Sequence, residues 1–201
     1  MSGLPVVAIA SGVGGGKSTL ARELARALGE AHVLDFDDFE PFTARPLAET
    51  CAWMRDGADP ARLRVPGLED ALRALKAGQA ARNPATAAEL RARGHVIFEA
   101  PFGRWHPDSG RHIDLLVWID TPLDIALARK LRQLSSAFPG PEAAFRPWLR
   151  EYLAAYLEGV EALLRLQHEK VRPGADLVLD GRADPGALAR QVARRLAADG
   201  A

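Results

Sequence analysis

A run of glycines followed by a lysine and two hydroxyl-bearing residues lies near the start of the chain: Gly12-Val13-Gly14-Gly15-Gly16-Lys17-Ser18-Thr19. Glycines allow backbone N–H groups to turn toward one point and to approach an anion closely. A lysine beside them supplies a positive charge, and a serine hydroxyl is an oxygen ligand of the kind that Mg²⁺ prefers. These eight residues therefore predict a site for nucleotide phosphates, with Lys17 neutralising charge and Ser18 binding Mg²⁺.

The segments on either side of this run have the character that a phosphate-binding loop requires. Leu4–Ala10 is nearly all apolar, which predicts a strand buried on both faces of a parallel sheet. After the run, leucines at every fourth position from 20 to 28 predict a helix that stops at Gly29. The order of strand, loop and helix resembles the P-loop, G-x-x-x-x-G-K-[ST], except that Ser11 occupies the position of its first glycine.

Carboxylates follow two further predicted strands. The strand Ala31–Asp35 leads into Asp37 and Asp38, and another strand, beginning at residue 95, ends in Glu99. Because the carboxyl ends of parallel strands form the ligand-binding edge of such a sheet, we expect these groups near the glycine loop. A carboxylate there accepts the proton of an attacking hydroxyl or holds Mg²⁺ directly or through water. Asp38 and Glu99 are thus candidate metal ligands together with Ser18; a solvated acidic turn is the alternative.

Two arginines share one face of a predicted helix over Pro122–Leu134. A stripe of leucines marks its buried face, and Arg129 and Arg132 lie opposite that stripe. Thr121 is the expected N-cap. The rigid guanidinium fork stabilises charge on a transferring phosphoryl group, so both arginines are candidate catalytic residues, with a solvated basic face as the alternative.

The P-loop followed by Asp37-Asp38-Phe39 resembles the uridine kinase and nicotinamide riboside kinase group of small-molecule kinases. Further similarity lies in Asp59-Pro60, in the Leu-Lys-x-Gly ending at Gly78, and in the segment 175–180. The acidic element of that group carries a catalytic aspartate, and its lid carries arginines. The resemblance therefore implies Asp37 as the catalytic base, Arg129 and Arg132 in a lid, and ATP and Mg²⁺ as cofactors.

Strand and helix patterns alternate along the rest of the chain. This alternation predicts an α/β fold: a P-loop NTPase with a doubly wound, five-stranded parallel sheet, helices on both faces and a helical lid at about 129–147, in one domain of residues 1–201. The remaining predicted elements are strands at His95–Glu99, Ile113–Asp120 and Asp176–Asp180, a short helix within Gln79–Gly94 begun by Asn83-Pro84, and helices at Trp148 to about Lys170 and at Pro185–Ala198, the last capped by Asp184.

Composition excludes several classes of protein. The 201 residues carry 26 Lys and Arg against 26 Asp and Glu, so nothing favours a nucleic acid or an acidic membrane as partner. No apolar run is long enough to span a membrane. The single cysteine, Cys51, cannot form an internal disulfide, and the start lacks a basic leader. We expect a cytoplasmic protein with a small-molecule partner, and a homodimer is left open.

These patterns favour an ATP- and Mg²⁺-dependent phosphotransferase that moves the γ-phosphoryl group to a hydroxyl of a small metabolite. The resemblance favours a nucleoside or nucleoside-like acceptor. One alternative keeps the chemistry but acts on a nucleotide, a coenzyme precursor or an antibiotic. Another is a regulatory ATP-binding module with slow hydrolysis, which Ser11 at the first P-loop position favours a little.

Overall fold

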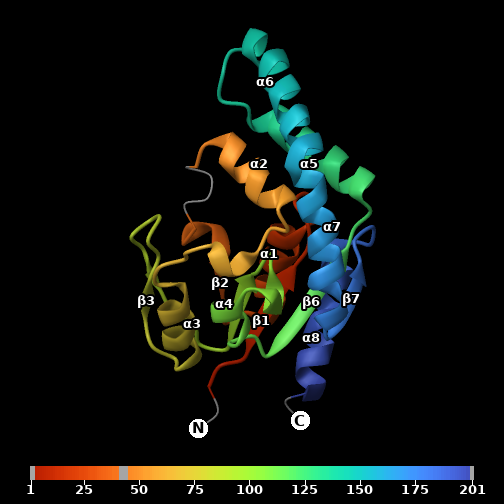
Figure 1. Cartoon of the computed structure of the whole chain (residues 1–201). Coiled ribbons are helices and arrows are strands. Elements are labelled where there is room, and N and C mark those ends of the chain that lie inside the picture. Colours follow the sequence, from red (N-terminus) through yellow and green to blue (C-terminus); the bar gives the residue numbers. More distant parts are fainter. Residues whose placement is uncertain (1–2, 41–44, 200–201) are drawn as a thin grey trace.

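The computed structural model describes residues 3–40 and 45–199, and its centre is a sheet of five parallel strands (Figure 1). The strands lie in the order β2-β5-β1-β6-β7. Each lies within a segment for which the sequence predicts a strand, so the doubly wound α/β fold is confirmed. Their bounds are β1 (Val6–Ala10), β2 (Ala31–Asp35), β5 (His95–Glu99), β6 (Leu115–Asp120) and β7 (Leu177–Asp180).

The central strand β1 is buried on both sides. Val6, Ala8 and Ala10 belong to a core cluster on one face of the sheet, whereas Val7 and Ile9 belong to a second cluster on the other face. A strand that is apolar at every position suits this environment, because its alternate side chains point to opposite faces. β1 therefore delivers the glycine loop to the middle of the carboxyl edge of the sheet.

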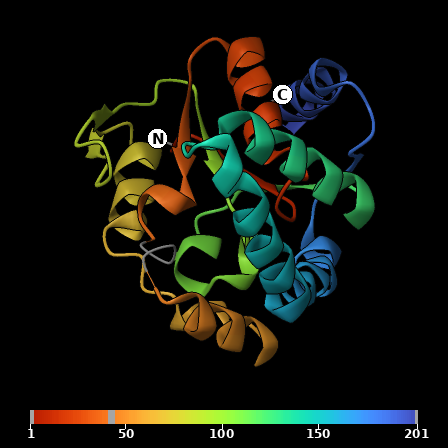
Figure 2. The ribbon, with the colours of Figure 1, turned by 90° about the horizontal axis from the view of Figure 1, so that it is seen from above.

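Helices cover both faces of the sheet. Seen from above, α1 and α8 lie on one side, while α2 and α7 lie on the other (Figure 2). The expected cap of the last helix is confirmed, since Asp184 Oδ1 accepts a hydrogen bond from Ala187 N at 2.9 Å. The bounds of these helices are α1 (Lys17–Leu28), α2 (Leu47–Arg55), α3 (Leu68–Lys76), the single turn α4 (Pro107–Gly110), α7 (Glu161–Lys170) and α8 (Pro185–Asp199).

Two helices rise above the carboxyl edge of the sheet as a hairpin (Figure 1). We call α5 (Leu123–Ala137) and α6 (Glu142–Ala155) the α5–α6 arm. The helix expected from Trp148 to about Lys170 is present, but it begins earlier, at Glu142, and a π-helical turn at Tyr156–Val160 lies between α6 and α7. The earlier start is favourable because the first turn holds Glu142, whose negative charge suits a helix N-terminus.

The prediction of a short helix within Gln79–Gly94 is wrong. The segment forms an antiparallel hairpin of β3 (Ala81–Arg82) and β4 (Glu89–Leu90). Asn83 Oδ1 accepts hydrogen bonds from the backbone N–H groups of residues 85 and 86 at 2.9 and 3.0 Å, as an N-cap side chain also does. The chain does not continue as a helix, because Ala87 adopts a left-handed φ of +58° and Asn83 N donates to Ala88 O across the turn at 2.9 Å.

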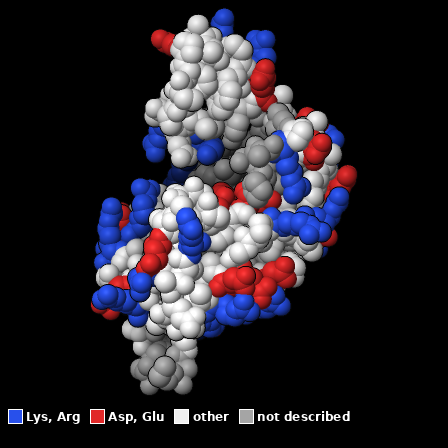
Figure 3. All heavy atoms as spheres, turned by 90° about the vertical axis from the view of Figure 1, so that its left-hand side faces the viewer, with Lys and Arg blue, Asp and Glu red and all other residues white. Residues whose placement is uncertain are grey.

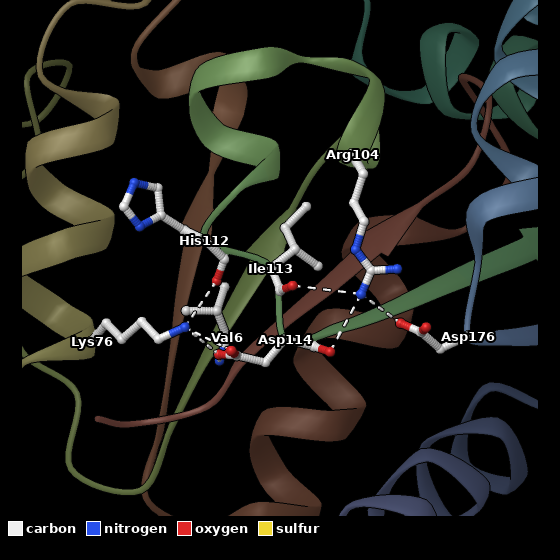
Figure 4. A network of polar contacts seen from close by, with 7 residues as sticks. All are labelled: Val6, Lys76, Arg104, His112, Ile113, Asp114 and Asp176. Carbon is white, nitrogen blue, oxygen red and sulfur yellow. Dashed lines mark hydrogen bonds and ion pairs between the residues drawn. The ribbon is translucent and has the colours of Figure 1, made fainter. Parts of the chain in front are cut away.

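A polar network ties the strands together at the amino-terminal edge of the sheet (Figure 4). Asp114 accepts hydrogen bonds from Val6 N at 2.8 Å and from Lys76 Nζ at 2.6 Å. Arg104 pairs with Asp176 at 2.7 Å and also donates to the carbonyl oxygen of Asp114 at 3.3 Å. These contacts fix the strand starts at the edge opposite the glycine loop.

Candidate active site

The glycine loop joins β1 to α1 and packs tightly against its surroundings. Gly14 has φ +75°, and a Cβ on it would lie 2.1 Å from the carbonyl oxygen of Ala126 in α5. A Cβ on Gly15 would lie 2.5 Å from Ser11 Oγ. Ser11 itself is buried and donates a hydrogen bond to Gly12 O at 2.9 Å. The loop therefore accommodates the serine by leaving no side chain at position 15.

Thr121 holds the other side of the loop. Its hydroxyl donates to Gly15 O at 2.9 Å, whereas α5 begins at Leu123 with Pro122 at its cap. The N-cap role expected for Thr121 is therefore wrong. The proline in place of a capping side chain frees the hydroxyl, so the end of β6 is bonded directly to the phosphate-binding loop.

Lys17 is the first residue of α1, and its ammonium lies under the loop. Nζ donates to the carbonyl oxygens of Ser11 at 3.1 Å and Gly12 at 3.4 Å. Burial lowers the pKa of this ammonium, although the nearby carboxylates of Asp37, Glu99 and Asp35 act in the opposite direction. A desolvated cation beside the N-terminus of a helix is suited to binding a phosphate, which would restore its lost electrostatic stabilisation.

Two carboxylates end neighbouring strands beside the loop. Asp35 of β2 and Glu99 of β5 are register partners, and Glu99 Oε2 accepts a hydrogen bond from Ser18 Oγ at 2.6 Å. Burial raises the pKa of Asp35 to about 6 and also raises that of Glu99. The predicted pair of Ser18 and Glu99 is thus brought together, while Asp35 is a site residue that the sequence analysis did not select.

The acidic turn after β2 separates the two aspartates it contains. Asp35 Oδ1 accepts a hydrogen bond from Asp37 N at 3.0 Å, which holds Asp37 at the cavity wall. Asp38 Oδ2 accepts a hydrogen bond from Asn83 Nδ2 of the β3–β4 hairpin at 2.6 Å. Within the described chain, Asp38 is not among the residues that line the cavity. Asp37 therefore lies with Lys17, and Asp38 is held by the hairpin.

The predicted arginines of α5 line the same cavity. Arg129 Nη1 donates to Gly181 O at 2.9 Å, which connects α5 to the loop after β7. Arg132 and Lys130 also line the cavity, and the charge of Lys130 contributes to lowering the pKa of Lys17. Three basic side chains from one helix therefore face the region above the glycine loop.

The cavity has a volume of about 910 Å³ and extends in two directions from the glycine loop. One end lies between α5 and residues 181–188, which include the first turn of α8. The other reaches between the acidic turn, α2, α6 and α7. Figure 3 shows the surface hollowed beneath the upper lobe, with acidic side chains visible in the hollow. The volume is within the range of small-molecule sites.

The second end of the cavity is lined by apolar side chains, and we call it the apolar arm. Its rings pack edge to face: the ring centroids of Phe36 and Phe102 are 5.6 Å apart, and those of Trp53 and Phe102 are 6.1 Å apart. Trp53 and Tyr152 also line this end of the cavity. The apolar arm consists of Phe36, Trp53, Met54, Leu63, Phe102, Tyr152, Val160 and Leu163.

The oxygen atoms beside the glycine loop suit a hard cation such as Mg²⁺, which also takes ligands from water and from the nucleotide phosphates. In residues 3–40 and 45–199, no group of three or more His, Cys, Asp or Glu side chains is arranged to hold a metal. Mg²⁺ commonly uses one or two protein oxygens together with waters and substrate phosphates. The Ser18 hydroxyl and the carboxylates of Glu99 and Asp35 supply oxygen ligands of this kind next to the phosphate-binding loop.

Comparison with known proteins places this geometry in context. No protein-family model matches the sequence, and no curated protein matches it. The shikimate kinase from Acinetobacter baumannii, solved with shikimate, is 15% identical, with a TM-score of 0.56 over 98% of this chain and 94% of that one. A possible uridine kinase from Bacillus stearothermophilus is 16% identical, with a TM-score of 0.54 over 90% of each chain. The chain has the P-loop kinase fold.

In the described part of the chain, no helix is both long and apolar enough to cross a membrane.

Proposed function

We propose that this protein is an ATP-dependent phosphotransferase that moves the γ-phosphoryl group to a hydroxyl of a small metabolite, with a nucleoside-like acceptor as the favoured class. One observation carries the proposal: Lys17 of the P-loop and the carboxylate of Asp37 line one cavity, which continues beyond them into the apolar arm. A site that only binds and hydrolyses a nucleotide has no need of this second chamber. The regulatory module is therefore the weaker alternative.

The nucleotide occupies the end of the cavity that includes the glycine loop. Backbone N–H groups of residues 12–19 bind the phosphates, and Lys17 neutralises the outer two. The base lies between α5 and the segment 181–188, whose junction is closed by the bond from Arg129 to Gly181. Arg132 and Lys130 offset charge on the transferring group.

The residues that would hold Mg²⁺ are Ser18 and Glu99, with Asp35 in the position that the sequence analysis assigned to Asp38. Asp38 is bonded to Asn83, whereas Asp35 is the register partner of Glu99. When bound, the ion draws electron density from the phosphate oxygens and so assists departure of ADP. Both carboxylates are ionised more readily beside a cation, which lowers their raised pKa values.

In the transfer step, the acceptor oxygen attacks the γ-phosphorus and the bond to the β–γ bridging oxygen breaks. The Asp37 carboxylate takes the proton from the acceptor hydroxyl. Lys17, Arg129 and Arg132 balance the negative charge that collects on the phosphoryl oxygens. The α5–α6 arm, which overlaps the expected lid at about 129–147, excludes water and suppresses hydrolysis when it closes.

Acceptor-stimulated formation of ADP tests the proposal. Purified protein with ATP and Mg²⁺ is offered a panel of nucleosides, ribosides of cofactor bases, and sugars. At least one acceptor is expected to raise the rate of ADP formation well above the rate without acceptor. Tight nucleotide binding with an unchanged rate across the panel would favour the regulatory module instead.

A further inference from the structure

The basic side chains that line the cavity come from the two helices that adjoin the glycine loop. Among the lining residues of the described chain, every lysine and arginine belongs to α1 or α5: Lys17, Arg22, Arg129, Lys130 and Arg132. The apolar arm itself consists of uncharged side chains. The residues at its mouth are carboxylates, Asp35 and Asp37. A ligand in this arm therefore meets apolar walls and negative charge.

A further carboxylate, that of Glu40, also lines the cavity. Its side chain is 2% exposed. Its carboxylate lies 3.8 Å from the guanidinium of Arg45, which is 39% exposed and is not among the lining residues. This cation partly offsets the charge of Glu40.

We infer that the acceptor carries no negative charge: it is a neutral or cationic hydroxyl compound with a flat apolar or aromatic body. This inference rests on the proposed function and narrows its acceptor. An anionic group that entered the arm would lose its water without gaining a cationic partner, which is strongly unfavourable. A cationic group would gain from the carboxylates of Asp35 and Asp37, which also line the cavity.

The inference discriminates among the acceptors left open by the sequence. A nucleotide acceptor would place its own phosphate in or near the apolar arm, where the described lining offers no basic side chain. A carboxylated acceptor meets the same obstacle. A neutral nucleoside, a cationic riboside or another uncharged aromatic alcohol does not.

Binding of matched compounds by the full chain tests the inference, with isothermal titration calorimetry as the readout. Each pair differs by one carboxylate: uridine and orotidine, nicotinamide riboside and nicotinic acid riboside, and shikimate methyl ester and shikimate. Within the pairs that bind, the carboxylate-free member is expected to bind at least about ten-fold more tightly. Equal or tighter binding of the carboxylated members would overturn the inference, as would a failure of every carboxylate-free compound to bind.

A variant pair keeps the test specific to charge. Leu163 of α7 lines the apolar arm of the cavity and is only partly buried, so a longer side chain can be accommodated there. Leu163→Lys is expected to reduce the preference against carboxylates to about three-fold or less, because it supplies the missing cation. Leu163→Met is the matched control, and it should keep the preference of the unmodified protein. A preference unchanged by the lysine would contradict the electrostatic cause.

The same panel separates this inference from the proposed function. If the carboxylate-free compounds bind preferentially but none stimulates ADP formation, the phosphotransferase proposal fails and the inference about ligand charge stands. If a carboxylated compound is the one phosphorylated, the phosphotransferase proposal stands and this inference fails.

Discussion

Single residues set opposing charges around the nucleotide end of the cavity. Lys17 is a desolvated ammonium whose hydrogen bonds go to loop carbonyls, and Asp35 and Glu99 are desolvated carboxylates at neighbouring strand ends. Burial lowers the pKa of Lys17 and raises the pKa values of Asp35 and Glu99, so it favours the neutral form of each group. Displaced pKa values in a cavity are typical of functional sites, because a bound ligand completes the charge balance.

Lys17→Met and Asp37→Asn should separate nucleotide binding from transfer. Lys17→Met is expected to weaken binding of Mg²⁺-ATP and to lower kcat by at least about 100-fold, since the phosphates lose their cation. Asp37→Asn should leave nucleotide affinity within about two-fold but lower kcat by about 100-fold, because it removes proton acceptance. Calorimetric titration and steady-state kinetics measure the two effects. An unchanged kcat in Asp37→Asn would remove this aspartate from the role of base.

Asp35→Asn should stabilise the ligand-free protein at neutral pH. Because the pKa of Asp35 is raised to about 6, the folded protein holds a proton that the unfolded chain has released, so stability falls as pH rises from about 4 to 6. Asparagine keeps the Oδ1 that accepts from Asp37 N. We expect a gain of about 1 kcal/mol at pH 7, allowing for solvent screening, and none near pH 4. Urea unfolding across this range measures it; equal gains at both pH values would contradict the assignment.

At the scale of elements, the phosphate-binding loop is shaped by its neighbours as much as by its own glycines. Gly14 lies against the backbone of α5, and Thr121 at the end of β6 bonds to Gly15. Any movement of α5 is therefore transmitted to the loop. The β3–β4 hairpin similarly reaches the acidic turn through Asn83 and Asp38.

Gly14→Ala should weaken nucleotide binding far more than a comparable change elsewhere. The new methyl group would clash with Ala126 O and would also face an unfavourable positive φ. Gly29→Ala is the matched control, since Gly29 has φ +74° but open space around it. We expect a loss of Mg²⁺-ATP affinity of at least ten-fold for Gly14→Ala, and only a small loss of stability, about 1 kcal/mol, for Gly29→Ala. Similar nucleotide affinities in the two variants would contradict the packing argument.

Asn83→Ala should slow transfer without changing nucleotide affinity. The variant loses the bond to Asp38 and the two turn bonds of the hairpin, so the acidic turn that carries Asp37 becomes less well positioned. We expect kcat to fall about ten-fold, with Asn83→Asp, which keeps the turn bonds, as the comparison. Kinetics at several pH values provide the readout. A fall in stability with kcat unchanged would limit Asn83 to a structural role.

Much of the architecture could be predicted from sequence because its signals are local. The strand ending at Ala10 is a continuous apolar run, and the P-loop follows it directly. The β3–β4 hairpin could not be predicted, because Asn83-Pro84 is also a good helix start and the side-chain bonds of Asn83 serve a turn and a helix N-terminus alike. The wall of the apolar arm was missed for a different reason: Trp53 and Phe102 have the sequence character of core residues, and only the tertiary fold leaves a cavity against them.

At the scale of the whole molecule, the two edges of the sheet have different tasks. The carboxyl edge carries the cavity, whereas the amino edge carries the network of Arg104, Asp114 and Asp176 (Figure 4). Placing stabilising ion pairs at one edge allows the other to keep desolvated charges that reduce stability when no ligand is bound.

Arg104→Met should therefore separate stability from activity. The variant loses the pair with Asp176 and bonds to backbone carbonyls, while methionine keeps much of the apolar stem. We expect the free energy of unfolding to fall by about 1–3 kcal/mol, with kcat and KM unchanged in the folded protein. Urea unfolding and steady-state kinetics measure these quantities. A large change in the kcat of the fully folded variant would show that the amino-terminal edge of the sheet influences the site.

The most direct test of phosphoryl transfer follows the phosphate itself. Protein, Mg²⁺ and ATP labelled with ³²P at the γ position are incubated with a mixture of neutral, cationic and anionic hydroxyl metabolites, and the products are separated. The label is expected in an organic phosphate ester, and its appearance should depend on both Lys17 and Asp37. Label recovered only as inorganic phosphate, at the same rate with and without the mixture, would contradict the assignment of this cavity to phosphoryl transfer.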